Sequence, residues 1–135
     1  MLTTIEQVIR LILSAGLGGM IGIEREKNHK PAGLRTHILV CVGSTLATIV
    51  SAHHYSSDPA RIAAAIMTGI GFLGAGAIIA SGNKGVHGLT TAATIWAAAA
   101  IGIAVGSGAY LLSIITTAII ISVLLSAKVA KTKKN

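Results

Sequence analysis

Five long apolar runs, each followed by a short polar or basic segment, make up nearly the whole chain. The runs extend over Ile5–Ile23, Thr36–His54, Ala60–Ala80, Leu89–Val105 and Ala109–Ala127. Each is close to the roughly 20 residues that an α-helix needs to cross a bilayer. Membrane-spanning strands are about 10 residues long and alternate apolar with polar positions, which these runs do not. The pattern therefore predicts an all-α, polytopic integral membrane bundle of about five transmembrane helices.

The composition supports this prediction. Hydrophobic residues make up 53% of the chain and charged residues 11%, whereas about a quarter of a typical soluble domain is charged. No charged residue occurs in residues 62–83 or 85–127. The first run has neither a basic segment before it nor a small-residue cleavage site after it, so we expect a retained helix rather than a signal peptide. We expect a transmembrane domain over residues 1–127 and a basic cytoplasmic tail over residues 128–135.

The distribution of basic residues predicts the orientation in the membrane. If the C-terminus is cytoplasmic, only Arg10 and Arg61 lie outside, and the remaining nine of the 11 basic residues lie inside. This arrangement follows the positive-inside rule, and it places the N-terminus outside. The net charge of +7 could also suggest a nucleic-acid partner. We exclude nucleic acid because the basic residues lie in short segments between apolar runs and aromatic residues for base stacking are scarce.

Small residues are concentrated within the apolar runs. Gly18 and Gly22 form a G-x-x-x-G pair in the first run, and Gly102 and Gly106 form another at the end of the fourth. Glycines also crowd the third run, at Gly69, Gly71, Gly74 and Gly76. Small residues let helix backbones approach closely in a bilayer. We expect tight helix packing at these positions, and both packing within the chain and contact between copies of the chain stay open.

The residues of the third run over 69–74 also match G-x-G-x-x-G, the dinucleotide-binding pattern. That pattern requires a preceding strand, a helix start and an acidic residue about 20 positions further on. Here the glycines lie within an apolar run, and no acidic residue follows Asp58. We therefore expect no dinucleotide cofactor.

Titratable residues are few, and they lie at the ends of the runs. The carboxylates are Glu6, Glu24, Glu26 and Asp58. Proton-coupled pumps place ionisable groups within the membrane, whereas these carboxylates lie at the ends of the runs or between them. His29, His37 and His87 are interpreted as polar residues at the membrane interface. The sequence therefore predicts no catalytic set, no metal site and no cofactor.

Two residues are expected to pair at the outer face. Asp58 precedes Pro59, and aspartate followed by proline is typical of a helix start. Arg61 lies in the first turn of that helix, close enough to pair with Asp58. Structural capping and a functional outer-face ion pair are both consistent with this spacing.

The predicted cytoplasmic face contains two similar segments. Residues 33–36 read Gly-Leu-Arg-Thr before the second run, and residues 88–91 read Gly-Leu-Thr-Thr before the fourth. They suggest a tandem repeat of two helical hairpins, whose helix starts would meet at one face. There we expect a cluster of Glu24, Arg25, Glu26, Arg35, Thr36, Thr90 and Thr91. Helix starts and basic residues favour an anion, such as a lipid phosphate.

Arg35 in particular is expected to have an acidic partner. It lies near the start of a helix, where the helix dipole favours anions rather than cations. Glu24, Glu26, a lipid phosphate or a neighbouring subunit could supply the negative charge. The alternative is that Arg35 anchors its helix among the lipid headgroups.

The sequence resembles the MgtC/SapB family of bacterial membrane proteins, also named for SrpB and YhiD. The resemblance rests on blocks that span most of the chain in a specific order. They are residues 19–26 (GMIGIERE), 30–37 (KPAGLRTH), 58–59 (DP), 61–64 (RIAA), 69–76 (GIGFLGAG), 88–94 (GLTTAAT) and Trp96. Longer members continue into a soluble C-terminal domain, whereas the sequence here ends with the basic tail. Any role that needs that domain is therefore not expected of these residues.

The resemblance implies a multi-pass protein of the bacterial inner membrane. It also implies a link to magnesium homeostasis and growth at low magnesium, and to virulence in some members. The leading hypothesis is a non-enzymatic protein that acts through helix contacts with itself, most simply as a homodimer, or with a membrane partner such as an F-type ATP synthase. The first alternative is a transporter or channel for magnesium or another small solute. The second is binding of a lipid or phosphate ligand at the basic cytoplasmic face.

Overall fold

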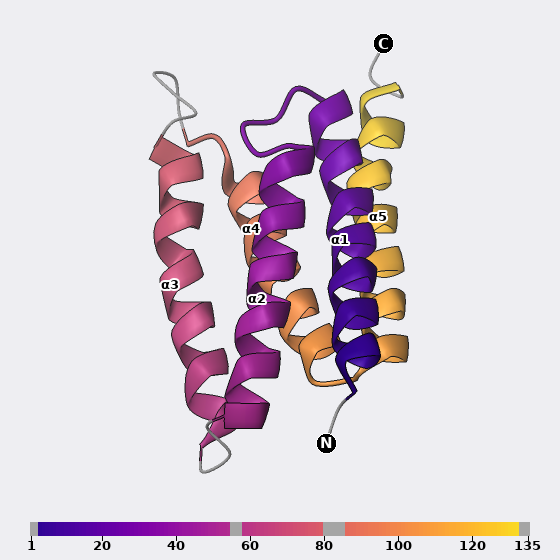
Figure 1. Cartoon of the computed structure of the whole chain (residues 1–135). Helices are drawn as coiled ribbons and strands as arrows, with labels where there is room; N and C mark the ends of the chain where they lie inside the picture. The colour runs from indigo at the N-terminus through magenta and orange to yellow at the C-terminus, as the bar shows by residue number, and fades with distance from the viewer. Residues whose placement is uncertain (1–2, 55–57, 80–85, 133–135) are drawn as a thin grey trace.

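The computed structural model describes residues 3–54, 58–79 and 86–132, and within these ranges it contains five α-helices and no strand. The helices are α1 (Thr4–Lys27), α2 (Leu34–His54), α3 (Pro59–Ile79), α4 (Leu89–Gly106) and α5 (Tyr110–Thr132). They run side by side, and the two termini lie at opposite ends of the bundle (Figure 1). The prediction of an all-α helical bundle is confirmed. Which end faces the cytoplasm stays a prediction.

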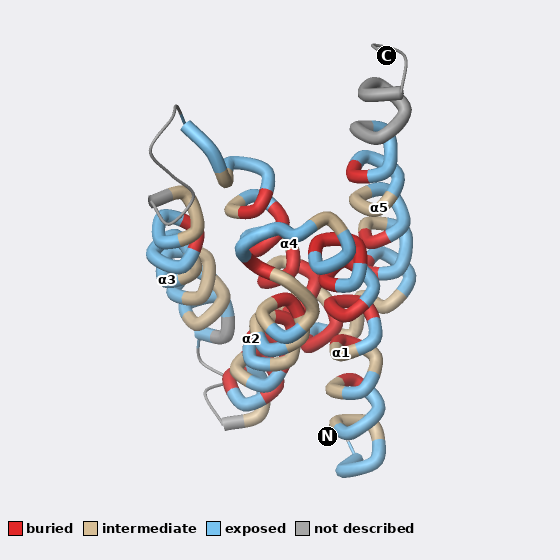
Figure 2. The backbone as a smooth tube through the Cα atoms, turned by 90° about the horizontal axis from the view of Figure 1, so that it is seen from above, coloured by how far each residue is buried: buried red, intermediate tan, exposed pale blue. Residues whose placement is uncertain are grey.

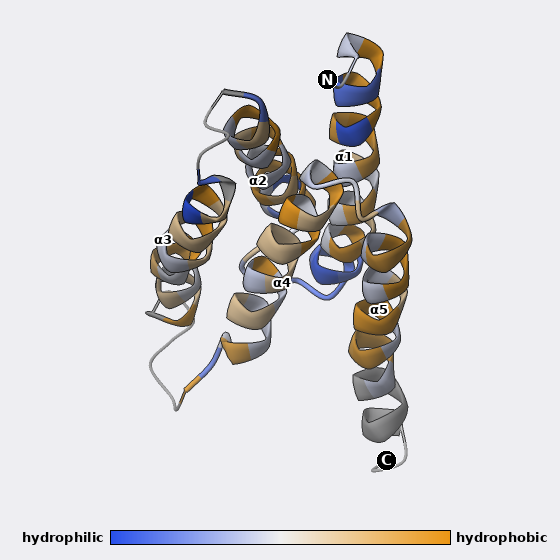
Figure 3. Ribbon diagram, turned by 90° about the horizontal axis from the view of Figure 1, so that it is seen from below, coloured by the Kyte–Doolittle hydropathy of each residue, from blue (hydrophilic) through white to orange (hydrophobic). Residues whose placement is uncertain are grey.

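The length and the surface of the helices are those of membrane-spanning segments. Helices α1 to α4 are each long and apolar enough to cross a membrane, while the described apolar part of α5, Tyr110–Ser126, is shorter. Large apolar side chains point outward: Leu39 is 71% exposed, Phe72 84% and Leu111 72%. Apolar residues line the helices, whereas the polar ones gather near helix ends and in the α1–α2 loop (Figure 3). A bilayer would cover this apolar exterior.

Two helix ends differ from the sequence prediction. Helix α1 continues through Lys27, four residues beyond the end of the first apolar run at Ile23. The additional turn is stabilised because Arg25 and Lys27 lie at the C-terminal, negative end of the helix dipole. The backbone of α5 continues through Thr132, beyond the boundary expected at residue 127.

Helix α4 is the centre of the bundle because it contacts each of the other four helices. Helix α2 contacts α1, α3 and α4, while α5 contacts α1 and α4. The buried backbone segments lie mostly where α1, α2 and α4 meet (Figure 2). The hydrophobic core there consists of Leu17, Ile21, Cys41, Ile101, Val105 and Leu124.

The two G-x-x-x-G pairs both pack against α2. A Cβ atom at Gly22 of α1 would lie 2.6 Å from the Cα atom of Leu34, so any side chain there would force the helices apart. A Cβ atom at Gly102 of α4 would lie 2.8 Å from the Cβ atom of Ser44. The Thr45 hydroxyl donates to the Gly102 carbonyl oxygen at 2.8 Å, across the same contact. Glycine is therefore required for the close approach of α1 and α4 to α2.

The glycines of α3 differ from this pattern. A Cβ atom at Gly74 would lie 3.5 Å from the Cβ atom of Ala92 in α4, which is ordinary contact. No atom lies within 4 Å of the corresponding position at Gly69, Gly71 or Gly76. Of the two alternatives that the sequence left open, packing within the chain therefore holds for Gly74 and not for the other three glycines. Contact between copies of the chain through them stays a prediction.

Candidate functional site

The end of α1 carries a buried ion pair. Glu24 and Arg25 are only 8% and 4% exposed. The Arg25 Nε atom donates to the Glu24 Oε2 atom at 2.6 Å, and a terminal guanidinium nitrogen of Arg25 contacts the same oxygen. The Asn28 amide donates to the Glu24 Oε1 atom and to the Glu24 carbonyl oxygen, both at 2.6 Å. Both carboxylate oxygens of Glu24 therefore have partners, which a buried charge requires.

The neighbouring carboxylate, Glu26, caps the start of α2. The Leu34 backbone N–H donates to the Glu26 Oε2 atom at 2.7 Å. The first N–H groups of a helix have no partner within the helix, and its dipole attracts negative charge. Glu26 thus supplies at α2 the anion that such a helix start favours. The chain turns between the two helices at His29, whose φ of 51° is in the left-handed region.

His37, in the first turn of α2, is buried and its ring contacts α4, while its position at the membrane interface stays a prediction. Its side chain is 0% exposed. The ring Nδ1 atom lies 2.8 Å from the Gly33 carbonyl oxygen, and Nε2 lies 3.0 Å from the Thr94 Oγ1 atom. The contact with Thr94 could not be inferred from position alone, because Thr94 is 57 residues away. The imidazole ring therefore connects the start of α2 to the first turns of α4.

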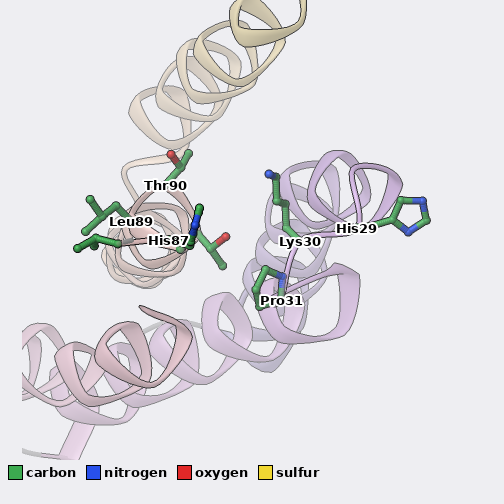
Figure 4. A pocket seen from close by; sticks show the side chains of 9 residues that line it. His29, Lys30, Pro31, His87, Leu89 and Thr90 are labelled. Atoms are coloured by element: carbon green, nitrogen blue, oxygen red, sulfur yellow. The ribbon is translucent and has the colours of Figure 1, made fainter. Parts of the chain in front are cut away.

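A hollow of about 740 Å³ separates the α1–α2 loop from the start of α4. It is lined by His29, Lys30, Pro31, Val86, His87, Gly88, Leu89, Thr90 and Thr91. Figure 4 shows Lys30 and Pro31 on one side, with His87, Leu89 and Thr90 opposite, while the His29 ring points away. Gly88 begins α4 with a φ of 84° and no side-chain cap. None of the lining residues is acidic.

The predicted seven-residue cluster is present only in part. The ends of α1 and the starts of α2 and α4 do lie at one end of the bundle (Figure 1). Glu24 and Arg25 are buried as a pair, whereas Glu26, Arg35 and Thr36 line a separate hollow of about 320 Å³. Thr90 and Thr91 line the larger hollow described above. The seven residues therefore share one end of the molecule but form three local groups.

Arg35 is exposed, and within the described ranges it forms no ion pair. The expected acidic partner from the chain itself is therefore wrong, since Arg25 neutralises Glu24 and the Leu34 backbone binds Glu26. A lipid phosphate or a second molecule as that partner stays a prediction.

The predicted outer-face pair is not joined through its side chains in the part of the chain that the structure describes. Asp58 and Arg61 are both exposed. The contact between them is a backbone hydrogen bond, from the Arg61 N–H to the Asp58 carbonyl oxygen at 3.3 Å. This geometry is a helix start, which agrees with the structural capping alternative.

A second polar group lies near the other end of the bundle and was not predicted. Arg10 of α1 is 8% exposed, although its position suggested a side chain that reaches the interface. Its guanidinium donates to the Gly106 carbonyl oxygen at 2.5 Å, to Tyr110 Oη at 2.8 Å and to Glu6 Oε1 at 2.7 Å. Only the spacing of Glu6 and Arg10, one helical turn, was visible in the sequence. The contacts with Gly106 and Tyr110 join segments about one hundred residues apart.

The apolar exterior and the four long apolar helices define a multi-pass membrane protein. Residues 11–133 match the MgtC family. The chain is 51% identical over 120 residues to the "Putative magnesium transporter YhiD" of Escherichia coli (strain K12), covering 82% of this chain and 55% of that protein. We conclude that the chain belongs to the MgtC family.

Two other curated relatives also match most of this chain but only about half of their own length. "Protein MgtC" of Brucella abortus (strain 2308) is 48% identical over 108 residues, covering 79% of this chain and 45% of that protein. "Protein SapB" of Bacillus subtilis (strain 168) is 43% identical over 112 residues, covering 76% and 48% respectively. The chain thus spans about half the length of the curated relatives it matches. No solved structure matches the chain.

Proposed function

We propose that this chain is a non-enzymatic protein of the bacterial inner membrane that is linked to magnesium and acts through helix contacts, rather than by carrying the ion. The link to magnesium comes from the family and from the name of the Escherichia coli relative, which calls that protein a putative magnesium transporter. The family match covers most of the chain, so this part of the proposal applies to the helical bundle itself.

The pairing of the buried charges is the observation that favours a mechanism without transport. Magnesium is bound in proteins by one or two carboxylates and usually keeps several of its waters. Glu24 is the buried carboxylate of the described residues, and both of its oxygens are bound by Arg25 or Asn28. Arg10, the other buried cation, is likewise bound by Tyr110 and a backbone carbonyl. A permeating cation would therefore have to replace an existing ion pair.

Several buried hydroxyl groups, which are candidates to line a polar path, already form hydrogen bonds within the bundle. Thr48 donates to the Ser44 carbonyl oxygen and Thr117 to the Ser113 carbonyl oxygen, each at 2.8 Å. Thr45 donates to Gly102 across two helices. The Thr45 bond connects α2 to α4, while Thr48 and Thr117 each donate to a carbonyl oxygen of their own helix. Hydroxyl groups that are bonded in this way support a closed bundle rather than a polar path.

Helix α3 is the element best placed to contact another molecule. It packs against α4 and α2 only, and Gly69, Gly71 and Gly76 face open space. In this proposal the exposed surface of α3 around Gly71 meets a second copy of the chain, which would make a dimer. A larger membrane complex, such as the F-type ATP synthase that the family implies, is the alternative partner.

Reconstitution into liposomes tests the choice between regulator and transporter. The purified chain is placed in vesicles that contain a magnesium-sensitive dye, and magnesium is added outside. We expect the dye signal to match that of empty vesicles, with a magnesium ionophore as the positive control. Saturable magnesium influx above that of empty vesicles would establish the transporter alternative instead.

Cross-linking tests the proposed dimer separately. In a Cys41→Ser background, Gly71→Cys and Ser113→Cys are compared in native membranes under mild oxidation. Gly71 faces open space, whereas Ser113 is buried and its replacement by cysteine changes only one atom. We expect disulfide-linked dimers for Gly71→Cys alone, and the dimer proposal fails if Gly71→Cys stays monomeric at normal membrane levels.

A further inference from the structure

The hollow between the α1–α2 loop and α4 contains hydrogen-bond donors without protein partners. Thr91 is only 2% exposed, yet it lines this hollow. Within the described part of the chain its hydroxyl forms no hydrogen bond, although the Thr94 hydroxyl donates to the backbone carbonyl of Thr91. The Thr91 hydroxyl is not among the fully enclosed polar atoms without a partner, so it is available as a donor to a group in the hollow.

The start of α4 provides further donors at the same place. The first backbone N–H with a partner inside the helix is that of Ala92, which donates to the Gly88 carbonyl oxygen at 2.8 Å. The N–H groups of Leu89, Thr90 and Thr91 precede it, and among the described residues they have no acceptor. These groups are located at the positive end of an 18-residue helix.

Helix α2 shows which kind of chemical group binds the free N–H groups at a helix start of this type. Helices α2 and α4 begin at matching residues, Leu34 and Leu89, after a glycine. In α2 the Glu26 carboxylate accepts the Leu34 N–H. At α4 no side chain of the described residues takes this position, and Gly88 itself has none to offer. Lys30 lies across the hollow, so the charge of the lining residues also favours an anion (Figure 4).

We propose that this hollow binds a phosphate group, through the Thr90 and Thr91 hydroxyls, the free N–H groups at the start of α4 and the Lys30 ammonium. Phosphate offers several acceptor oxygens, which suits a helix start together with a charge-assisted donor. The group could belong to a lipid headgroup, since the site lies at one end of a membrane bundle, or to free phosphate. This proposal does not depend on whether the chain transports magnesium.

Titration calorimetry on the delipidated chain in dodecyl maltoside tests the proposal and separates the two sources. Inorganic phosphate is titrated at constant ionic strength, with chloride as the reference anion. In a second arm, dioctanoyl phosphatidic acid is compared with dioctanoylglycerol, which lacks the phosphate. Saturable binding of phosphate would indicate a soluble ligand, and binding of phosphatidic acid alone would indicate a lipid. No saturable binding in either arm would overturn the proposal.

Matched variants locate the site. Thr91→Val and Lys30→Gln each remove one donor, and each should weaken binding by about tenfold. Thr68→Val and Lys27→Gln are the controls, because both residues are exposed and neither lines the hollow. Thr91→Val should also keep the melting temperature of the wild type, since its hydroxyl has no protein partner. Equal weakening by the controls, or a marked loss of stability in Thr91→Val, would overturn the assignment.

Discussion

Arg10 and Tyr110 lie 100 positions apart in the chain, yet the Arg10 Nε atom donates to the Tyr110 Oη atom at 2.8 Å. The centre of the guanidinium also lies 5.5 Å from the centroid of the tyrosine ring, within the range of a cation–π interaction. Together with the bond from Arg10 to the Gly106 carbonyl oxygen, this contact ties α1 to the turn between α4 and α5. The positive charge also lies at the C-terminal, negative end of α4.

Replacing Arg10 should therefore destabilise the bundle. Arg10→Met keeps the length of the side chain but leaves the Gly106 carbonyl oxygen and Tyr110 without this donor. We expect a loss of about 1.5–3 kcal/mol in unfolding free energy, as for hydrogen bonds to charged groups. Thermal melting in detergent measures it, with Arg61→Met as the exposed control. Equal melting temperatures for the two variants would show that the Arg10 contacts do not contribute.

The glycine contacts predict opposite effects for the same substitution at two positions. Gly102→Ala places a methyl group against the Cys41 backbone and the Ser44 side chain, so it should cost about 1–3 kcal/mol. Gly71→Ala meets no neighbour within the chain and should raise helix stability by about 0.5–1 kcal/mol. Melting of both variants as monomers in detergent is the measurement. A loss at Gly71 as large as that at Gly102 would contradict the described packing of α3.

The buried pair at the end of α1 predicts a loss of folded protein when one partner is neutralised. Glu24→Gln leaves the Arg25 guanidinium buried without a counter-charge, at a cost of roughly 3–5 kcal/mol. Arg35→Gln removes an exposed charge that has no ion pair among the described residues, so it should accumulate normally. Membrane levels and melting temperatures distinguish the two. Normal levels and melting for Glu24→Gln would show that the pair is solvated rather than buried.

The charge distribution predicts the orientation of the bundle. A reporter active only outside the cytoplasm should work at the N-terminus and fail at the C-terminus, because most basic residues are expected inside. A reporter active only in the cytoplasm should give the reverse pattern. The opposite placement of the two ends in the bundle is consistent with this test (Figure 1). If both termini were found on the same side of the membrane, the predicted five-helix topology would be wrong.

Hydrophobic length and glycine spacing were sufficient to predict the bundle from the sequence. A run of about 20 apolar residues is expected to span a bilayer as a helix, because a helix forms all of its backbone hydrogen bonds within the segment. The start of α4 at Leu89 was also predicted, whereas α2 begins at Leu34, two residues before the predicted Thr36. These properties depend on residues close together in the chain.

The partners of the polar residues were decided by the tertiary structure. The sequence placed Glu24, Arg25 and Arg35 together, but packing buried the first two as a pair and left Arg35 outside. The sequence left open whether the glycines of α3 pack within the chain, and the arrangement of the neighbouring helices determines which of them do. The contacts of His37 with Thr94 and of Arg10 with Tyr110 join distant segments. Such contacts depend on how the helices rotate and pair, which no local pattern specifies.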